Sequence, residues 1–190
     1  MLYRLRGFYL LFLSLIIPNC IFAQTESGAE LVSLERHQLT LDLMSPGIRY
    51  ELGLTNNISA STSFSPGLAS YQAGDILGYA IHNRLRLYLN LLHRLNKGKN
   101  TSGNSGDYFA VANTVFWGNL QITGNLEASD DFALAFYGGM YGVQRTFERG
   151  FNYNIELGFG HYQGDGTTNG YGPLLSFSFG WVPTKRKSRK

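Results

Sequence analysis

The sequence predicts an all-β fold, an eight-stranded antiparallel up-and-down transmembrane β-barrel with a side-chain-filled lumen. The 190-residue chain contains 23 glycines and 14% aromatic residues but only 15% charged residues. Short segments that alternate between apolar and polar residues are separated by turn signals, which is typical of barrels and sandwiches. The clearest is FNYNIELGFGHY at 151–162, whose period of two indicates a strand with two chemically different faces. After the N-terminal leader, no apolar run reaches the length of about 18 residues that a membrane-spanning helix needs.

Residues 1–23 are predicted to be a secretory signal peptide. They combine a basic start, an apolar run at 10–17 and a cleavage site after Ala23. A lipoprotein signal with lipid on Cys20 is the alternative, and it is disfavoured because Asn19 precedes the cysteine where a small residue is expected. Removal of this segment takes away two arginines and no acid, which lowers the formal charge from +3 to +1. The apparent basicity therefore gives no reason to expect nucleic-acid binding.

The only cysteine, Cys20, leaves with the signal peptide. A disulfide framework and a thiolate metal site are therefore excluded for the mature chain. The rest of the chain divides into a periplasmic N-terminal segment (24–36), an outer-membrane barrel (37–183) and a basic C-terminal tail (184–190).

The first two strands are predicted at 37–44 and 48–54, where leucines and isoleucine alternate with polar residues. The triplet at 45–47, Ser-Pro-Gly, interrupts the pattern. Because this connection is very short, one long kinked strand over 37–54 is an open alternative.

The turn at 55–57, Thr-Asn-Asn, leads into a third strand at 58–64. We expect asparagine to supply a left-handed conformation in this turn, as short hairpins require. The residues at 65–78 are predicted to form a longer loop.

The fourth strand is predicted at 79–92, with leucines on one face and His82, Arg84 and Arg86 on the other. A polar connector follows at 96–106. The fifth strand is predicted at 107–118, with Phe109 and Trp117 on its apolar side.

Residues 119–131 either extend the fifth strand or form a loop. The sixth strand is predicted at 132–147, and a turn at 148–150 joins it to the seventh strand, 151–162. A loop at 163–170 leads to the eighth strand, 171–183.

An even number of strands places both chain termini in the periplasm, as bacterial barrels require. The turn at 55–57, the connector at 96–106 and the turn at 148–150 then lie on the periplasmic side, and the loops near 65–78, 119–131 and 163–170 lie outside.

Charged residues collect on the face opposite the apolar one. An eight-stranded barrel is just wide enough to be filled by side chains, so acids and bases of both signs can pair there. The predicted charge network of the lumen consists of Asp42, Arg49, Glu51, His82, Arg84, Arg86, Arg145 and Glu156. Small residues on the same side are expected to leave room for the arginines: Ala133, Ala135, Gly139, Gly158 and Gly160.

Aromatic residues at predicted strand ends favour a membrane barrel over a soluble lectin-like sandwich, because outer-membrane barrels carry aromatic girdles at both interfaces. The predicted girdle consists of Trp117, Phe147, Phe151, Tyr171 and Trp181.

The runs RLRLYLNLLHRLNKGKNTSGNSGDYFAVA (84–112) and GVQRTFERGFNYNIELGFGHY (142–162) resemble the small outer-membrane β-barrel proteins of the Bacteroidota. In these proteins an Arg-Xaa-Tyr-Xaa-Asn strand, a Lys-Gly-Lys-Asn connector and a later Gly-Xaa-Gln-Arg strand recur. The resemblance implies a porin-like β-barrel fold of the cell envelope and no assigned activity. Such barrels commonly end on an aromatic residue that the barrel-assembly machinery reads, whereas nine residues follow Trp181 here.

Enzymatic and metal sites are not expected. The connector at 96–106 lacks the glycine spacing and the strand-to-helix context of a phosphate loop. The four histidines, His37, His82, His93 and His161, lack metal-ligand spacing on any one strand face. A lipid hydrolase with His161 as base and Ser63 or Ser65 on another strand is the weaker alternative to an interfacial histidine.

The sequence thus predicts a non-enzymatic protein of the Gram-negative outer membrane, with a structural, envelope-maintaining or loop-mediated interaction role. A barrel enzyme that modifies lipid, and a narrow pore or ligand-binding barrel, are the alternatives. No catalytic residue, cofactor or metal is expected. The expected partners are outer-membrane lipids and, during insertion, the assembly machinery.

Overall fold

The computed structural model describes residues 33–44, 46–71, 74–124, 132–164 and 169–183. The predicted signal peptide and basic tail lie outside these ranges. Within them, no helix has the length and apolarity that would let it cross a membrane. The elements are β1 (His37–Asp42), β2 (Gly47–Gly53), β3 (Ile58–Tyr71), β4 (Gly74–Tyr88), α2 (Leu91–Asn96), β5 (Asp107–Gly124), β6 (Phe132–Thr146), β7 (Phe151–Gly164) and β8 (Gly170–Trp181).

The eight strands close into one antiparallel ring in which each strand pairs with its neighbours in the sequence. The ring is completed where β1 pairs with β8, through Leu41 opposite Trp181 and Asp42 opposite Gly180. The predicted all-β architecture of eight antiparallel strands is therefore confirmed.

β1 and β2 are separate strands, which decides the open alternative at 37–54. They form a hairpin in register from His37 opposite Leu52 to Asp42 opposite Gly47. Proline at 46 has no N–H to donate and lies in the turn between them.

The 55–57 turn is present, but no asparagine in it is left-handed, because Asn104 is the only non-glycine residue with positive φ in the described part of the chain. The Thr55 hydroxyl holds the turn instead, accepting a hydrogen bond of 3.0 Å from the Ile58 amide.

Two predicted loops are partly strand. Residues 65–71 continue β3 and residues 74–78 begin β4, and the register of the pair runs from Ile58 opposite Leu87 to Tyr71 opposite Gly74. Residues 72–73 lie outside the described residues. β5 continues through Gly124, and the remainder of the 119–131 segment lies outside the described residues. The tract 65–78 was misassigned because Pro66 and four small residues around it resemble a turn signal, although the pairing of long neighbouring strands overrides this local preference.

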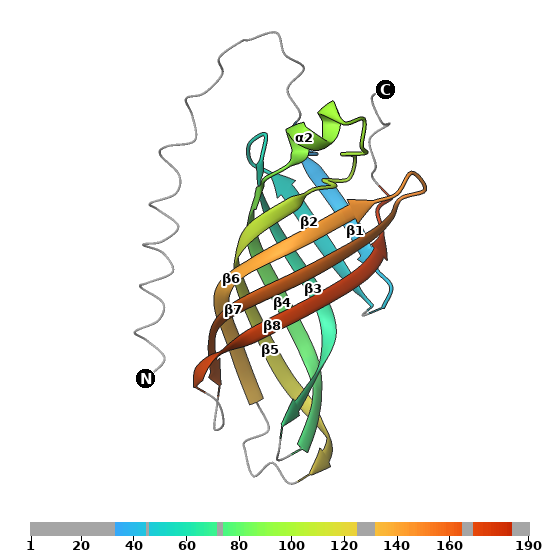
Figure 1. The fold of residues 1–190 in the computed structure, drawn as a ribbon. Coiled ribbons are helices and arrows are strands. Elements are labelled where there is room, and N and C mark those ends of the chain that lie inside the picture. The colour runs from blue at the N-terminus through green and yellow to red at the C-terminus, as the bar shows by residue number, and fades with distance from the viewer. Residues whose placement is uncertain (1–32, 45, 72–73, 125–131, 165–168, 184–190) are drawn as a thin grey trace. The chain divides into compact units, whose positions relative to one another are not determined.

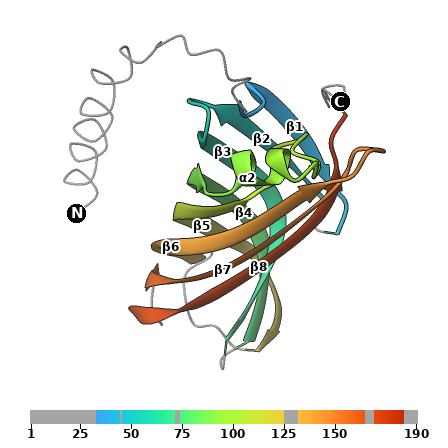
Figure 2. The same ribbon diagram turned by 45° about the horizontal axis from the view of Figure 1, so that its top comes forward.

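One end of the ring carries α2, the 55–57 turn and the turn between β6 and β7 (Figure 1). We call this the connector end and the opposite one the loop end. The sequence predicted a strand to residue 92, but α2 begins at Leu91 and turns the chain across the connector end, as Figure 2 shows.

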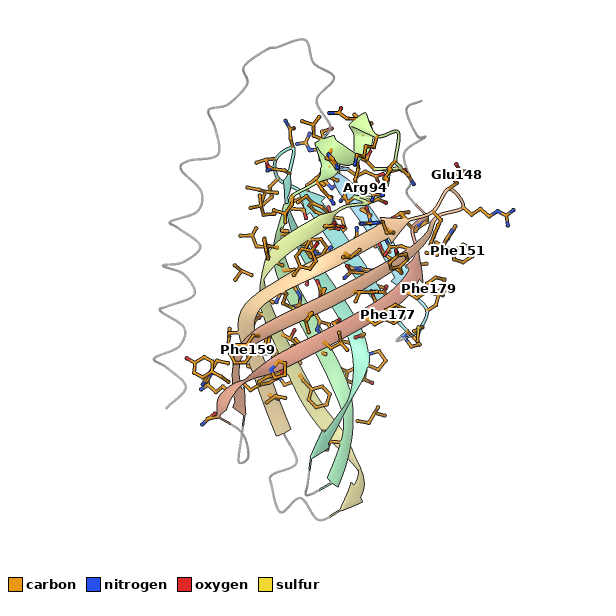
Figure 3. All side chains as sticks on the ribbon, viewed as in Figure 1. Arg94, Glu148, Phe151, Phe159, Phe177 and Phe179 are labelled. Atoms are coloured by element: carbon orange, nitrogen blue, oxygen red, sulfur yellow. The ribbon has the colours of Figure 1, made fainter. Side chains whose placement is uncertain are left out.

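Side chains alternate between the interior of the ring and its outer surface. On β7 the even-numbered residues Asn152, Asn154 and Glu156 are buried. Phe151, just before them, and Leu157, just after them, are exposed. Figure 3 labels further outward-facing aromatic residues on β7 and β8, including Phe159 and Phe177.

The predicted placement of Ala133, Ala135 and Gly139 on the inner side is wrong. On β6 the buried side chains are the even-numbered Phe136, Met140, Gln144 and Thr146, so the odd-numbered residues face outward. The charge of Arg145 suggests an inward phase for the odd-numbered residues, but its side chain lies near the connector end, where it is about one-fifth exposed and pairs with Asp107.

We expect the two glycines that lie three residues apart on β6 to respond oppositely to alanine. A Cβ at inward-facing Gly142 would lie 2.3 Å from the buried ring of Tyr108, whereas a Cβ at Gly139 would meet nothing within 4 Å. Gly142→Ala should lower the free energy of unfolding by about 1–3 kcal/mol, as overpacking does. Gly139→Ala should leave it unchanged or slightly higher, and equal losses in a denaturant titration would contradict the assigned phase of β6.

Candidate functional site

The centre of the ring is occupied by Arg86, which is 2% exposed. Its Nη1 atom donates to Glu51 at 3.0 Å and to Gln144 at 3.1 Å, and its Nη2 atom lies 3.5 Å from Glu156. The guanidinium carbon also lies 4.6 Å from the centroid of the Tyr108 ring. One arginine on β4 therefore ties together side chains of β2, β6 and β7 and stacks on β5.

The two glutamates next to Arg86 are saturated with donors. Glu51 accepts hydrogen bonds from Ser59 at 2.6 Å and from Tyr88 at 2.8 Å. Glu156 accepts from Tyr108 at 2.8 Å. Because removal of any one donor leaves a buried carboxylate short of a partner, the cluster acts as a unit.

Two further ion pairs extend the cluster. Arg84 donates from Nε to Glu156 at 3.2 Å, and Arg49 donates from Nη2 to Asp42 at 2.9 Å and to Asn152 at 3.1 Å. The structure thus gathers three bases and three acids in the interior: a chain of ion pairs through Arg84, Glu156, Arg86 and Glu51, and a separate pair of Arg49 with Asp42. We call these six residues the interior network.

The structure places the other two predicted members differently. His82 lies beside the network and makes a 3.1 Å hydrogen bond with Thr114. Arg145 is on the outward face and pairs with Asp107, where both side chains are about one-fifth exposed. Sequence reasoning left Tyr108 and Gln144 out of the network. The period of two could have identified Tyr108, because it precedes the outward-facing Phe109.

The connector end is closed by the segment that follows α2. Gln144 donates to the Gly103 carbonyl at 3.1 Å, and Thr146 donates to the same oxygen at 2.9 Å. Gly103 has a φ of +62°, and a Cβ there would lie 2.5 Å from the Thr146 hydroxyl. Only glycine therefore allows the connector to approach the inner wall this closely.

The N-terminal segment joins this closure. Glu35 is buried, accepts a hydrogen bond from the Gly103 amide at 2.7 Å and donates its own amide to the Asn104 side chain at 2.8 Å. Leu34 packs with Leu91 and Tyr108 in the apolar cluster beneath. The described part of the predicted periplasmic segment is thus attached to the connector.

On the other side of the interior network lies a cavity of about 530 Å³. Arg49, Arg84 and Glu156 contribute to its wall, and five serines line it, namely Ser61, Ser63, Ser65, Ser176 and Ser178. Three atoms of its lining residues, Arg49 Nε, Arg86 Nε and Ser178 Oγ, are buried and have no hydrogen-bond partner in the described part of the protein.

The predicted histidine–serine arrangement is not formed. His161 packs edge-on against Tyr171 at 5.0 Å between ring centroids, whereas Ser63 and Ser65 line the interior cavity. Ser63 is instead directly opposite His82 in the pairing of β3 with β4. Among the described residues, no group of three or more histidine, cysteine, aspartate or glutamate side chains is arranged to hold a metal ion.

The five predicted girdle residues are all exposed, but their positions along the strands differ. Phe151 and Trp181 are opposite each other at the connector end, next to Phe147 in the adjoining turn. Tyr171 lies at the loop end of β8, whereas Trp117 is seven residues short of the end of β5, because this strand is longer than predicted.

Comparisons with protein-family models, with curated proteins and with solved structures find no match for this chain.

The two kinds of arginine should differ sharply in their effect on stability. Arg86→Met leaves Glu51 and Glu156 in the interior without their shared cation, so we expect a loss of about 3–5 kcal/mol in the free energy of unfolding. Arg145→Met removes an ion pair at a partly exposed rim and should cost at most about 1 kcal/mol. Denaturant titrations of the two variants provide the measurement, and similar losses would contradict the central role of Arg86.

Proposed function

We propose that this protein is an integral β-barrel of the Gram-negative outer membrane, with a non-enzymatic role in envelope structure or in interactions through its loops. The observation that supports this most is the outer surface of the ring, where large apolar side chains are exposed on every strand. Examples are Val111 at 69%, Leu157 at 60% and Leu175 at 71% exposure. Soluble monomers rarely expose so extended an apolar surface, whereas a bilayer requires it.

The interior supports the same proposal. Apolar residues outside and ion pairs inside invert the usual arrangement of a soluble protein. A closed ring also leaves few unpaired backbone groups, which is the condition for strands to cross hydrocarbon. We therefore interpret the interior as a side-chain-filled lumen.

A narrow open pore is less well supported. The interior network lies across the ring, and the connector with Gly103 covers its connector end. Both lie in the path that ions would follow. In planar bilayers we accordingly expect no steady conductance from the folded protein.

The orientation follows from the strand count. Because β1 begins and β8 ends at the connector end, we place this end and both termini in the periplasm (Figure 1). Insertion by the barrel-assembly machinery then depends on β8, whose last strand residue is the aromatic Trp181.

A charge on the outer surface tests the membrane location. Leu157→Arg places a cation on the outward face halfway along β7 and should lower the free energy of unfolding in vesicles by about 2–4 kcal/mol. Leu92→Arg is the matched control, because Leu92 is equally exposed at 60% but lies on α2 outside the strands. Its effect should stay within about 0.5 kcal/mol.

Two outcomes would overturn the proposal. One is an equal tolerance of arginine at both positions. The other is recovery of the protein as a folded monomer in buffer without detergent, in place of an outer-membrane fraction that shows a heat-dependent shift on cold SDS gels.

A further inference from the structure

The hairpin that closes the ring is much shorter than the rest of its wall. β1 and β2 have six and seven residues, whereas the other strands have 12 to 18. Figure 1 shows this hairpin, in blue, ending part-way along the ring. The wall between β3 and β8 is therefore complete only near the connector end.

The strand registers locate the incomplete part. Pairing of β2 with β3 ends at Ile48 opposite Phe64, and pairing of β1 with β8 ends at Asp42 opposite Gly180. One more hydrogen bond joins the Leu43 amide to the Phe179 carbonyl. Beyond these points, the described strand pairing of β3 is with β4 alone and that of β8 is with β7 alone. We call the interval between 65–71 of β3 and 170–178 of β8 the seam.

Each edge of the seam carries a proline, Pro66 on β3 and Pro173 on β8. Proline within a sheet is confined almost entirely to edges and bulges, because it has no N–H to donate to a ladder. Edge prolines also hinder the pairing of a further strand. The sequence therefore favours a seam that stays unpaired over one that takes up a strand from another chain.

The interior cavity extends to the seam. Its wall includes Ser65, Pro66 and Gly67 from one edge and residues 175–178 from the other. Ser176 and Ser178 are on the inner face of β8, whereas Leu175 and Phe177 are on the outer face with exposures of 71% and 50%. The cavity therefore adjoins the seam, where residues from both faces of β8 border it.

The lining changes from apolar at the seam to polar in the interior. Leu175 and Phe177 form its outer part, and Arg49, Arg84, Arg86, Asp42 and Glu156 form its inner part. These charges are balanced by pairing, because Glu51 neutralises Arg86 at 3.0 Å from outside the lining, so the need for an acceptor comes from donors that have no partner. These donors are Arg49 Nε, Arg86 Nε and Ser178 Oγ–H. A ligand that suits this lining has an anionic, acceptor-rich head and an apolar tail.

We propose that the cavity binds a single-chain amphiphile with a carboxylate head, which enters sideways from the membrane through the seam. The carboxylate lies near Arg49 and the serines of β3 and β8, and the hydrocarbon chain passes Leu175 and Phe177 into the bilayer. The cavity volume is within the range of ligand sites, about 300–1,000 Å³. This inference rests on the proposed location of the ring in the outer membrane.

The test uses stearic acid with a nitroxide at carbon 5 and, as a probe with the same tail and no charge, its methyl ester. The full chain is reconstituted in phosphatidylcholine vesicles, and electron paramagnetic resonance separates immobilised from fluid label. We expect the immobilised acid to saturate at one per chain and the ester to bind about tenfold more weakly, equivalent to about 1.4 kcal/mol.

Two variants address the site. Ser63→Phe fills the cavity from β3 and should abolish saturable immobilisation, whereas Thr62→Phe, the neighbouring residue on the outer face, should leave it unchanged. If Ser63→Phe does not fold, Ser176→Leu, which fills the same cavity from β8, replaces it. This variant should likewise abolish saturable immobilisation.

The outcomes separate the two proposals. Failure of the wild-type chain to float with the vesicles would overturn the proposed function. Floating, heat-shifted protein that immobilises acid and ester equally, or that is unaffected by the cavity-filling variants, would overturn the amphiphile site alone.

Discussion

The structure depends on the need to satisfy charge in the interior of a closed ring. Each of the strands β2, β4 and β7 carries at least one charged residue that alternation directs inward, and none of these residues reaches bulk water. Arg86 solves this problem because its two terminal nitrogens donate to Glu51, Glu156 and Gln144 at once. A buried network of this kind is a weak source of net stability but penalises any other register strongly, because a shift by one residue would turn every inward charge outward.

The same requirement accounts for the unequal filling of the interior. β5 and β6 contribute Tyr108, Ala112, Phe136 and Met140, an apolar inner surface that packs against Leu91 and Leu34 near the connector end. The charges come from the flanking strands β4 and β7 and from β1 and β2. Tyr108 belongs to both regions, because its ring packs in the apolar cluster and its hydroxyl donates to Glu156. The connector end is thereby compact, and the cavity lies on the other side of the network.

The sequence predicts the parts of this structure that depend on alternation. Strand number, order and the inward placement of Arg49, Glu51, Arg84, Arg86 and Glu156 all follow from a period of two. Prediction from the sequence fails where the alternation of apolar and polar residues carries no information. On β6, the glycines and alanines do not show which residues face the interior, so Arg145 was placed on the wrong face. α2 was missed because LLHRLN continues a leucine-rich strand pattern without a break. The cavity could not be predicted, since it arises from strand lengths and register.

The backbone groups at the edges of the seam determine which side chains can lie beside it. In hydrocarbon, an unpaired backbone N–H or C=O costs several kcal/mol, so an incomplete wall is tolerated only where other polar groups are within reach. Pro66 and Pro173 each remove one donor from the two edges. The serines that alternate along the inner faces of β3 and β8 place hydroxyl groups beside the remaining edge groups. A wall gap lined by hydrocarbon alone would be unstable, and a gap lined by hydroxyls in front of an arginine cluster is one that a polar head group can occupy. The short β1–β2 hairpin thus closes the ring near the connector end and, by its length, determines where the seam begins.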